Sequence, residues 1–266
     1  MCLATANMDP QAAQPARLPF TIVINTCHAY QGVSMPVLLD SLAMAGIPAE
    51  SLLVVCGQSP ASDSGVTVAE GGIRVHRVPY TAEALTGLIH LSESADGVPD
   101  GGWILYIQDT MVVGQQFGPR IMETFRQIME RPSGSTTGLV AVKLLDQFSL
   151  SVGFYDVAWL REVREEIQGF KVMSADEHAM RDIKTWCEDK IFDMCPPERI
   201  AHLAEFAGRQ HMGTFKYSET SADRIIEHYP VLDLYKFKSW DGNVARVGMY
   251  RDPATGEERI RIPVGL

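Results

Sequence analysis

The chain has 266 residues, of which 46% are hydrophobic and 21% are charged. This length suits one large domain, which can bury roughly three quarters of its unfolded surface and so folds without a disulfide or a metal. The 23 basic and 33 acidic residues give a net charge of −10. That balance argues against a nucleic-acid-binding protein, because such proteins carry a basic excess.

The sequence predicts a cytoplasmic protein with no transmembrane segment. No apolar run approaches the roughly 18 residues that a membrane-spanning helix needs, and the N-terminus lacks the basic and apolar regions of a secretory signal. The five cysteines are odd in number and none of them forms a C-x-x-C pair. This usage indicates reduced thiols and argues against structural zinc.

The first half of the chain alternates strand and helix patterns. After a leader at 1–17, rich in Ala, Gln and Pro and expected to be flexible, the sequence predicts strands at 20–25, 52–56, 73–78, 103–107 and 139–144, and helices at 35–45, 81–92 and 116–130. Ser34 can cap the first helix and Gly46 can end it. Strand 73–78 alternates apolar and polar residues, which predicts one wetter face. Such alternation predicts βαβ units and a mainly parallel sheet flanked by helices.

The regular alternation of strand and helix patterns ends after about residue 148. The sequence predicts a strand at 149–155 and helices at 157–167, at 174–192 and at 197–207, with the aromatic and basic segment 209–251 wrapping back over the sheet. We therefore expect a single domain at 18–251, with a nucleotide-binding half at 18–147 and an acceptor half at 148–251, and a C-terminal segment at 252–266.

Several familiar motifs are missing from the sequence. It has no G-x-G-x-x-G after the first strand, no G-x-x-x-x-G-K-[ST], no G-x-S-x-G and no H-E-x-x-H. In open α/β sheets, ligands bind at the carboxyl ends of the strands near the point where the strand order reverses. The candidate nucleotide-binding residues at these ends are Thr26, His28, Tyr30, Gln108 and Asp109.

The segment Ile104-Leu105-Tyr106-Ile107-Gln108-Asp109-Thr110-Met111-Val112-Val113 resembles the strand of GT-A glycosyltransferases that ends in their D-x-D motif. The opening β-α-β pattern resembles the start of the same family, and Val152-Gly153-Phe154-Tyr155-Asp156 resembles its acceptor-side strand. This resemblance covers about residues 20 to 240 in layout. It implies a Rossmann-like GT-A sandwich and transfer of a sugar from a nucleotide-diphosphate donor to an acceptor hydroxyl.

The motif is degenerate in this chain. The family's last Asp falls on Asp109, whereas its first falls on Ile107. The resemblance implies that Asp109 holds a divalent cation, Mn²⁺ or Mg²⁺, which bridges the donor diphosphate, and that His228 is its second protein ligand. The structural alternatives are that Asp109 only ends a strand and begins a turn, and that His228 is an ordinary packed or exposed residue.

Asp176 and Glu177 are the candidates for the catalytic base. In inverting members of the family, an acidic residue at the start of a helix under the acceptor deprotonates the attacking hydroxyl. Capping is the alternative for both residues: Glu177 has the spacing to reach back to Ser174, and the helix dipole favours an acid at the position of Asp176.

A basic and aromatic cluster in the last third of the chain predicts an anion site. Its basic members are Arg209, Lys216, Arg224, Lys236, Lys238 and Arg246. A diphosphate leaving group is the natural anion, with Lys236 as the candidate nucleotide contact; a solvated surface is the alternative.

The sequence as a whole predicts a glycosyltransferase. Its partners would be a nucleotide-sugar donor and a carbohydrate or other hydroxyl acceptor, not a nucleic acid, and its oligomeric state stays open. The alternatives are a non-catalytic GT-A-like binding or assembly protein, which would explain the missing first acid, and a nucleotidyltransferase. The latter would normally show a Gly-rich loop after the first strand, and 25–32 contains one Gly.

Overall fold

A computed structural model describes residues 18–29, 31–32, 34–94, 98, 102–130, 138–144, 152–171, 194–195, 197–202, 214–217, 225–229, 231–238, 248–251 and 258–261. Its helices are α1 (Met35–Met44), α2 (Thr86–Glu93), α3 (Phe117–Glu130), α4 (Val157–Glu162) and α5 (Arg164–Gln168). Its strands are β1 (Phe20–Cys27), β2 (Leu52–Gly57), β3 (Gly65–Val68), β4 (Arg74–Arg77), β5 (Trp103–Gln108), β6 (Met111–Val113), β7 (Ala141–Lys143), β8 (Gly153–Asp156), β9 (Ile200–His202), β10 (Thr214–Tyr217), β11 (Ile225–Tyr229), β12 (Leu234–Lys238), β13 (Gly248–Arg251) and β14 (Glu258–Arg261).

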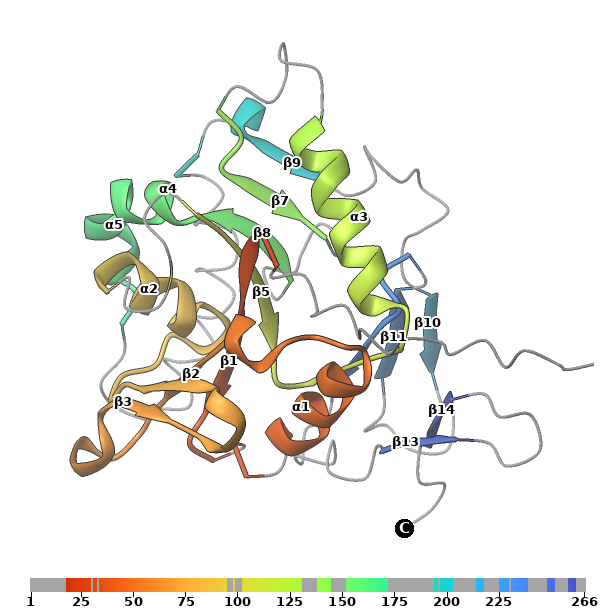
Figure 1. The fold of residues 1–266 in the computed structure, drawn as a ribbon. Helices are drawn as coiled ribbons and strands as arrows, with labels where there is room; N and C mark the ends of the chain where they lie inside the picture. Colours follow the sequence, from red (N-terminus) through yellow and green to blue (C-terminus); the bar gives the residue numbers. More distant parts are fainter. Residues whose placement is uncertain are drawn as a thin grey trace, which may run out of the picture.

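The central sheet has eight strands in the order β3-β4-β2-β1-β5-β8-β7-β9. Strands β4, β2, β1 and β5 run parallel, and β9 runs parallel to β7, whereas β3 and β8 are antiparallel to their neighbours. The chain moves outward from β1 through β2 to β4 and then crosses back over β1 to place β5 on its other side (Figure 1). The strand order therefore reverses between β1 and β5.

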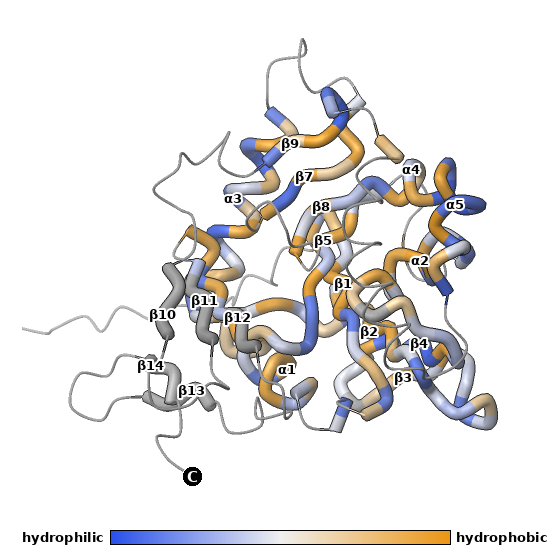
Figure 2. Tube along the Cα trace, turned by 180° about the vertical axis from the view of Figure 1, so that it is seen from behind, coloured by the Kyte–Doolittle hydropathy of each residue, from blue (hydrophilic) through white to orange (hydrophobic). Residues whose placement is uncertain are grey.

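Both faces of the sheet are covered, and alternate residues of β1 point to opposite faces. Ile22 and Ile24 belong to a core with the buried residues of α1 and α3, whereas Val23 belongs to a core with those of α2, α4 and α5. All three β1 side chains are fully buried. Figure 2 shows hydrophobic residues along β1 and hydrophilic residues on the outer side of α5. Helices on both faces explain why β1 is a continuous apolar run.

A second sheet joins the C-terminal part of the chain to the end of β5. Its order is β10-β11-β12-β6, so β6, which follows β5 after a two-residue turn, is its edge strand. Lys236 of β12 pairs with Met111 of β6. Strands β10, β11 and β12, which belong to the segment expected to wrap back over the sheet, therefore form a sheet with β6, next to the end of β5.

The structure confirms the predicted fold class. It is α/β and Rossmann-like, with a mostly parallel central sheet flanked by helices, a layout consistent with the GT-A sandwich that the resemblance implies. The strands and helices predicted in the first half are present with ends shifted by a few residues; β3, an exposed edge strand inside the expected loop region, was not predicted.

Three predictions about individual segments are wrong. The helix expected at 197–207 is, over the described residues 197–202, a 3₁₀ turn (Pro197–Arg199) followed by β9, because pairing with β7 overrides the local helix preference. The helix expected at 157–167 is interrupted at Val163, which leaves helical dihedrals (φ −94°, ψ 18°). The wetter face expected for strand 73–78 fails at His76, which is buried, with Nδ1 2.7 Å from Nε2 of His90 in α2.

The division into halves stays a prediction, and the leader at 1–17 lies outside the described residues. Strands β13 and β14 pair across the boundary expected between 251 and 252. In the part of the chain that the structure describes, no helix is both long enough and apolar enough to cross a membrane.

Candidate functional site

The candidate site lies where the strand order reverses. At this edge of the sheet β1 ends at Cys27, β2 ends at Gly57 and β5 ends at Gln108. Thr26 pairs with Cys56, and Asn25 pairs with Gln108, so the ends of the three strands are level. This is the position at which open α/β sheets bind their ligands. We call it the carboxyl edge.

Asp109 is the buried carboxylate of the carboxyl edge. It follows β5 directly, and only 7% of its surface is exposed. Its Oδ2 accepts a 2.6 Å hydrogen bond from the hydroxyl of Thr26 and a 2.8 Å hydrogen bond from the hydroxyl of Ser34. Burial raises the pKa of Asp109 above its ordinary value, and the two hydroxyl donors oppose that rise. The group is thus a desolvated acid that two polar side chains hold in place.

Ser34 joins Asp109 to the first turn of α1. Ser34 is the N-cap residue, as predicted, but its side chain makes no capping bond and donates to the carboxylate instead. Pro36 lies in the first turn of the helix. Proline lacks a backbone N–H, and the amides of the first turn have no partner within the helix, so no helical hydrogen bond is lost. The positive end of the helix dipole therefore lies beside the acid, which favours its charged form.

Asn25 braces the same strand end from the other side. Its backbone oxygen accepts the Asp109 amide at 3.1 Å, and its side-chain Oδ1 accepts the amide of Gly87 at 2.9 Å. Gly87 belongs to the first turn of α2. The ends of β1 and β5 are thereby fixed to a helix on each face of the sheet.

The loop after β1 is fixed against the end of β2. His28 donates its backbone amide to the oxygen of Gly57 at 2.9 Å. The thiol of Cys56 donates to Oε1 of Gln31 at 3.5 Å, and Nε2 of the same amide donates to Nδ1 of His28 at 3.1 Å. This orientation of the amide leaves the proton of a neutral His28 on Nε2. His28 is exposed, so it can offer that proton to a ligand.

The structure brings four of the predicted nucleotide-binding residues together at the carboxyl edge: Thr26, His28, Gln108 and Asp109. The backbone of Lys236 lies close to the carboxyl edge, because it pairs with Met111, two residues after Asp109. Tyr30 lies outside the described residues. Thr26 contacts Asp109 directly and is itself buried, so it supports the acid rather than facing solvent.

The predicted catalytic pair, Asp176 and Glu177, also lies outside the described residues. The proposed metal ligand His228 lies in β11, where its backbone pairs with Tyr235, which in turn pairs with Val112 of β6. Two strand spacings, about 10 Å, therefore separate the backbones of His228 and Val112.

Sequence reasoning missed three residues of the site: Asn25, Gln31 and Ser34 in its role toward the acid. Ser34 was recognised only as a helix cap, because nothing local links it to a residue 75 positions later. A polar residue at the end of a buried strand is the sequence pattern that indicates such a site residue. Asn25, which follows the apolar run 20–24, has this pattern.

Among the described residues placed above at the carboxyl edge, Asp109 supplies the acidic oxygen for a cation. Among the residues that the structure describes, no group of three or more His, Cys, Asp or Glu is arranged to hold a metal ion. A hard cation can be held by one carboxylate when phosphate oxygens supply further ligands. The donors among the described residues thus fit a cation that enters with a diphosphate and receives further ligands from it.

No protein-family model matches the chain, and no curated protein matches its sequence. Among solved structures, the chain is similar to the one titled "Crystal structure of S. aureus TarS 1-349", with a TM-score of 0.34 and 10% sequence identity. The similarity covers 54% of this chain and 49% of that one, so the chain spans about half the length of this neighbour.

Proposed function

We propose that the protein is a glycosyltransferase that binds a nucleotide-diphosphate sugar at the carboxyl edge and transfers the sugar to an acceptor hydroxyl. The observation that carries the proposal is the setting of Asp109. This residue matches the last acid of the D-x-D motif in the sequence, and it stands directly after β5 at the reversal of strand order. A buried acid held by two hydroxyls at that point is suited to a ligand that brings its own cation.

The residues around Asp109 have distinct parts in this proposal. Thr26 and Ser34 hold the carboxylate in one orientation, and His28 offers an exposed Nε2–H to a phosphate or ribose oxygen. Lys236, whose backbone pairs with Met111 of β6, is a proposed further contact of the diphosphate. When bound, Mn²⁺ or Mg²⁺ would neutralise charge on the leaving diphosphate. His228 remains a proposed further ligand.

The base in this proposal is Asp176 or Glu177. A general base contributes roughly 10²–10⁴ in rate, so Asp176→Asn or Glu177→Gln should lower turnover by that factor if the substituted acid is the base. Gln keeps the capping bond at position 177, and the stability of that variant should hardly change. Turnover within a few-fold of wild type in both variants would remove both residues from the mechanism.

One observation favours a non-catalytic nucleotide-sugar-binding protein as the second candidate. Ile107, at the position of the motif's first acid, is fully buried in the core shared with α1 and α3. A second acid could not stand there without losing its solvation. If this candidate is correct, donor binding persists and no sugar is released or transferred.

Thermal unfolding with UDP or GDP, each with and without Mn²⁺, tests the donor site. We expect Mn²⁺ alone to leave the melting temperature unchanged and the nucleotide with Mn²⁺ to raise it, since saturation at 100 times Kd adds about 2.7 kcal/mol to the free energy of unfolding. Asp109→Asn should abolish the metal-dependent part of the rise.

Asp156→Asn is the matched control. It makes the same substitution at the other edge of the sheet, where Asp156 pairs with Trp103, so its response to nucleotide and Mn²⁺ should equal that of wild type. Absence of a shift with either nucleoside diphosphate, with or without Mn²⁺, would contradict the glycosyltransferase proposal and the second candidate together.

A further inference from the structure

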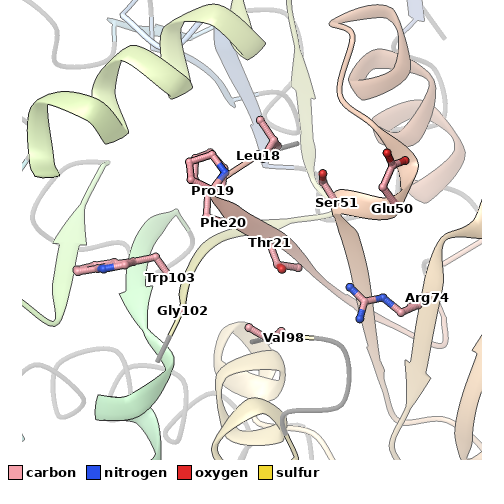
Figure 3. Close-up of a pocket in the computed structure, with 10 residues that line it drawn as sticks. All are labelled: Leu18, Pro19, Phe20, Thr21, Glu50, Ser51, Arg74, Val98, Gly102 and Trp103. Atoms are coloured by element: carbon pink, nitrogen blue, oxygen red, sulfur yellow. The ribbon is translucent and has the colours of Figure 1, made fainter. Parts of the chain in front are cut away.

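A cavity opens at the opposite edge of the central sheet from Asp109. It has a volume of about 680 Å³, within the range of small-molecule sites. Figure 3 shows its lining at the amino ends of β1, β2, β4 and β5, with Thr21, Ser51, Arg74 and Trp103 among the ten labelled residues. We call it the amino-edge cavity.

The amino-edge cavity is separate from the carboxyl edge. Thr21 lines it, and Thr26, on the same strand, contacts Asp109. Five residues of strand at about 3.3 Å each place these two positions about 17 Å apart. A nucleotide bound at the carboxyl edge would therefore leave the cavity empty, so a ligand in the cavity would be a second one.

Two largely buried residues bring hydroxyls to the cavity that have no side-chain partner among the described residues. Thr21 is 8% exposed and Ser51 is 6% exposed. Within the described part of the chain, neither hydroxyl makes a hydrogen bond, and neither oxygen is sealed from the cavity. Both oxygens are open to the cavity and unpaired among the described residues, so they are available to a ligand that can both donate and accept hydrogen bonds.

Arg74 gives the cavity a positive wall. It makes no hydrogen bond or ion pair with any described residue. Figure 3 shows its guanidinium extended toward Thr21, whereas the carboxylate of Glu50 points the other way. A half-buried guanidinium that pairs with no acid among the described residues is suited to recognise a phosphate or carboxylate through paired N–H donors.

Val98 and Trp103 complete the lining with apolar surface. The cavity thus presents one cationic group, two hydroxyls, an apolar side and the carboxylate of Glu50, which points away from Arg74. The side of the cavity that faces Arg74 matches a ring-sized molecule bearing one acid group and several hydroxyls. We propose that the amino-edge cavity binds a small hydroxylated organic anion, a sugar phosphate or a sugar acid, with Arg74 on the acid group and Thr21 and Ser51 on its hydroxyls.

Titration calorimetry on the full chain with glucose 1-phosphate, glucuronate and glucose tests the proposal. We expect one of the two anions to bind more tightly than neutral glucose, and which of them binds distinguishes a phosphate from a carboxylate ligand. Arg74→Gln should weaken that anion about tenfold or more, because it removes hydrogen bonds to a charged group.

Arg77→Gln is the matched control, since it removes the same charge three residues further along β4. Arg77 lies beyond the cavity lining and donates to Thr67. Screening at physiological salt should limit its effect on anion affinity to about twofold. Equal losses in both variants would show a diffuse charge effect and overturn the site.

Thr21→Val keeps the shape of the side chain and removes its hydroxyl. Because that hydroxyl has no partner among the described residues, the variant should unfold at the same urea concentration as wild type while binding the anion about fivefold more weakly. Unchanged binding in both Arg74→Gln and Thr21→Val, or the lack of binding of either anion to wild type at millimolar concentration, would overturn the proposal.

The carboxyl edge supplies the last comparison. Asp109→Asn should bind the anion as wild type does, and UDP with Mn²⁺ should not displace it. Loss of anion binding in Asp109→Asn, or displacement by UDP, would place the anion at the carboxyl edge and overturn the proposal. The test of the donor site uses nucleotides and Mn²⁺ without any of the sugar anions, so either proposal can fail without the other.

Discussion

The hydroxyl of Ser34 donates a 2.8 Å hydrogen bond to the carboxylate of Asp109, 75 residues further along the chain. Ser34 is the N-cap residue of α1, yet its side chain accepts no bond from the helix. The first turn of α1 therefore orients a buried acid at the end of β5. Ser34 therefore has two roles: it is the residue at which α1 begins, and it orients the acid of the candidate site.

Replacing Ser34 with Ala tests how strongly that contact supports the fold. The variant leaves the buried Asp109 with one hydroxyl donor, and a buried charged group that loses a partner costs about 1–3 kcal/mol. We expect a loss of that size in the free energy of unfolding, measured with urea. Ser62→Ala is the control: its hydroxyl bonds Asp63 at an exposed position, and its loss should stay within about 0.5 kcal/mol. Equal losses in the two variants would show that the hydrogen bond to Asp109 contributes no more to the free energy of unfolding than an exposed one.

Gly87→Ala should destabilise the protein although it places a better helix former in α2. A methyl group at Gly87 would lie 2.7 Å from Cε2 of Tyr106, a fully buried ring whose hydroxyl donates to the oxygen of Ala84 at 2.6 Å. Overpacking of this kind costs about 1–3 kcal/mol, which exceeds the helix-propensity gain of about 1 kcal/mol.

Gly32→Ala is the control for the Gly87 substitution, because nothing lies within 4 Å of a methyl group at Gly32. Urea unfolding should show a loss for Gly87→Ala and little change for Gly32→Ala. A stabilised Gly87→Ala variant would mean that Tyr106 can move aside. In that case the close contact between α2 and β5 does not fix the ring.

The sequence could predict the elements whose signal is local. The βαβ half and its carboxyl edge follow from the buried runs at β1, β2 and β5 and from the residues that begin and end α1. Asp109 was found because the residues around it resemble a known motif. These features depend on periodicity and on neighbours in the chain, and the sequence alone contains both.

Features that depend on distant partners could not be predicted. Residues 200–202 form a strand because β7 lies beside them, and His76 is buried because His90 of α2 covers it. The hydrogen bond from Ser34 to Asp109 likewise needs the return of the chain from β4 to β5. In each case the outcome depends on which segments pack together, which local preference does not encode.

Asp156→Ala should weaken the start of α4. The Asp156 side chain accepts a 2.9 Å hydrogen bond from the amide of Ala158, as an N-cap residue does. Loss of such a cap costs typically about 1 kcal/mol. Asp156→Asn keeps the acceptor, so urea unfolding should place it within a few tenths of wild type. If Ala and Asn are equally destabilising, the charge rather than the cap is what stabilises this helix.

The pH dependence of stability should reveal the buried state of Asp109. Burial raises its pKa in the folded protein above the ordinary value of 3.8, so the folded state holds the proton more tightly than the unfolded state. The stability that this proton contributes is present below the ordinary pKa and is lost as the pH rises through the folded pKa. Asp109→Asn cannot titrate and should therefore gain stability relative to wild type across that window.

Urea unfolding at intervals from about pH 3.5 to about pH 8 measures this difference between wild type and Asp109→Asn. The control has the opposite sign: the hydrogen bond from Arg126 lowers the pKa of the exposed Glu123, so Glu123→Gln should lose stability relative to wild type as the pH rises. If the difference between wild type and Asp109→Asn is independent of pH, the folded and unfolded states bind the Asp109 proton equally. The two hydroxyl bonds from Thr26 and Ser34 would then fully offset the burial of the acid, and the carboxylate would be charged at the carboxyl edge over the whole range in which a cation could bind.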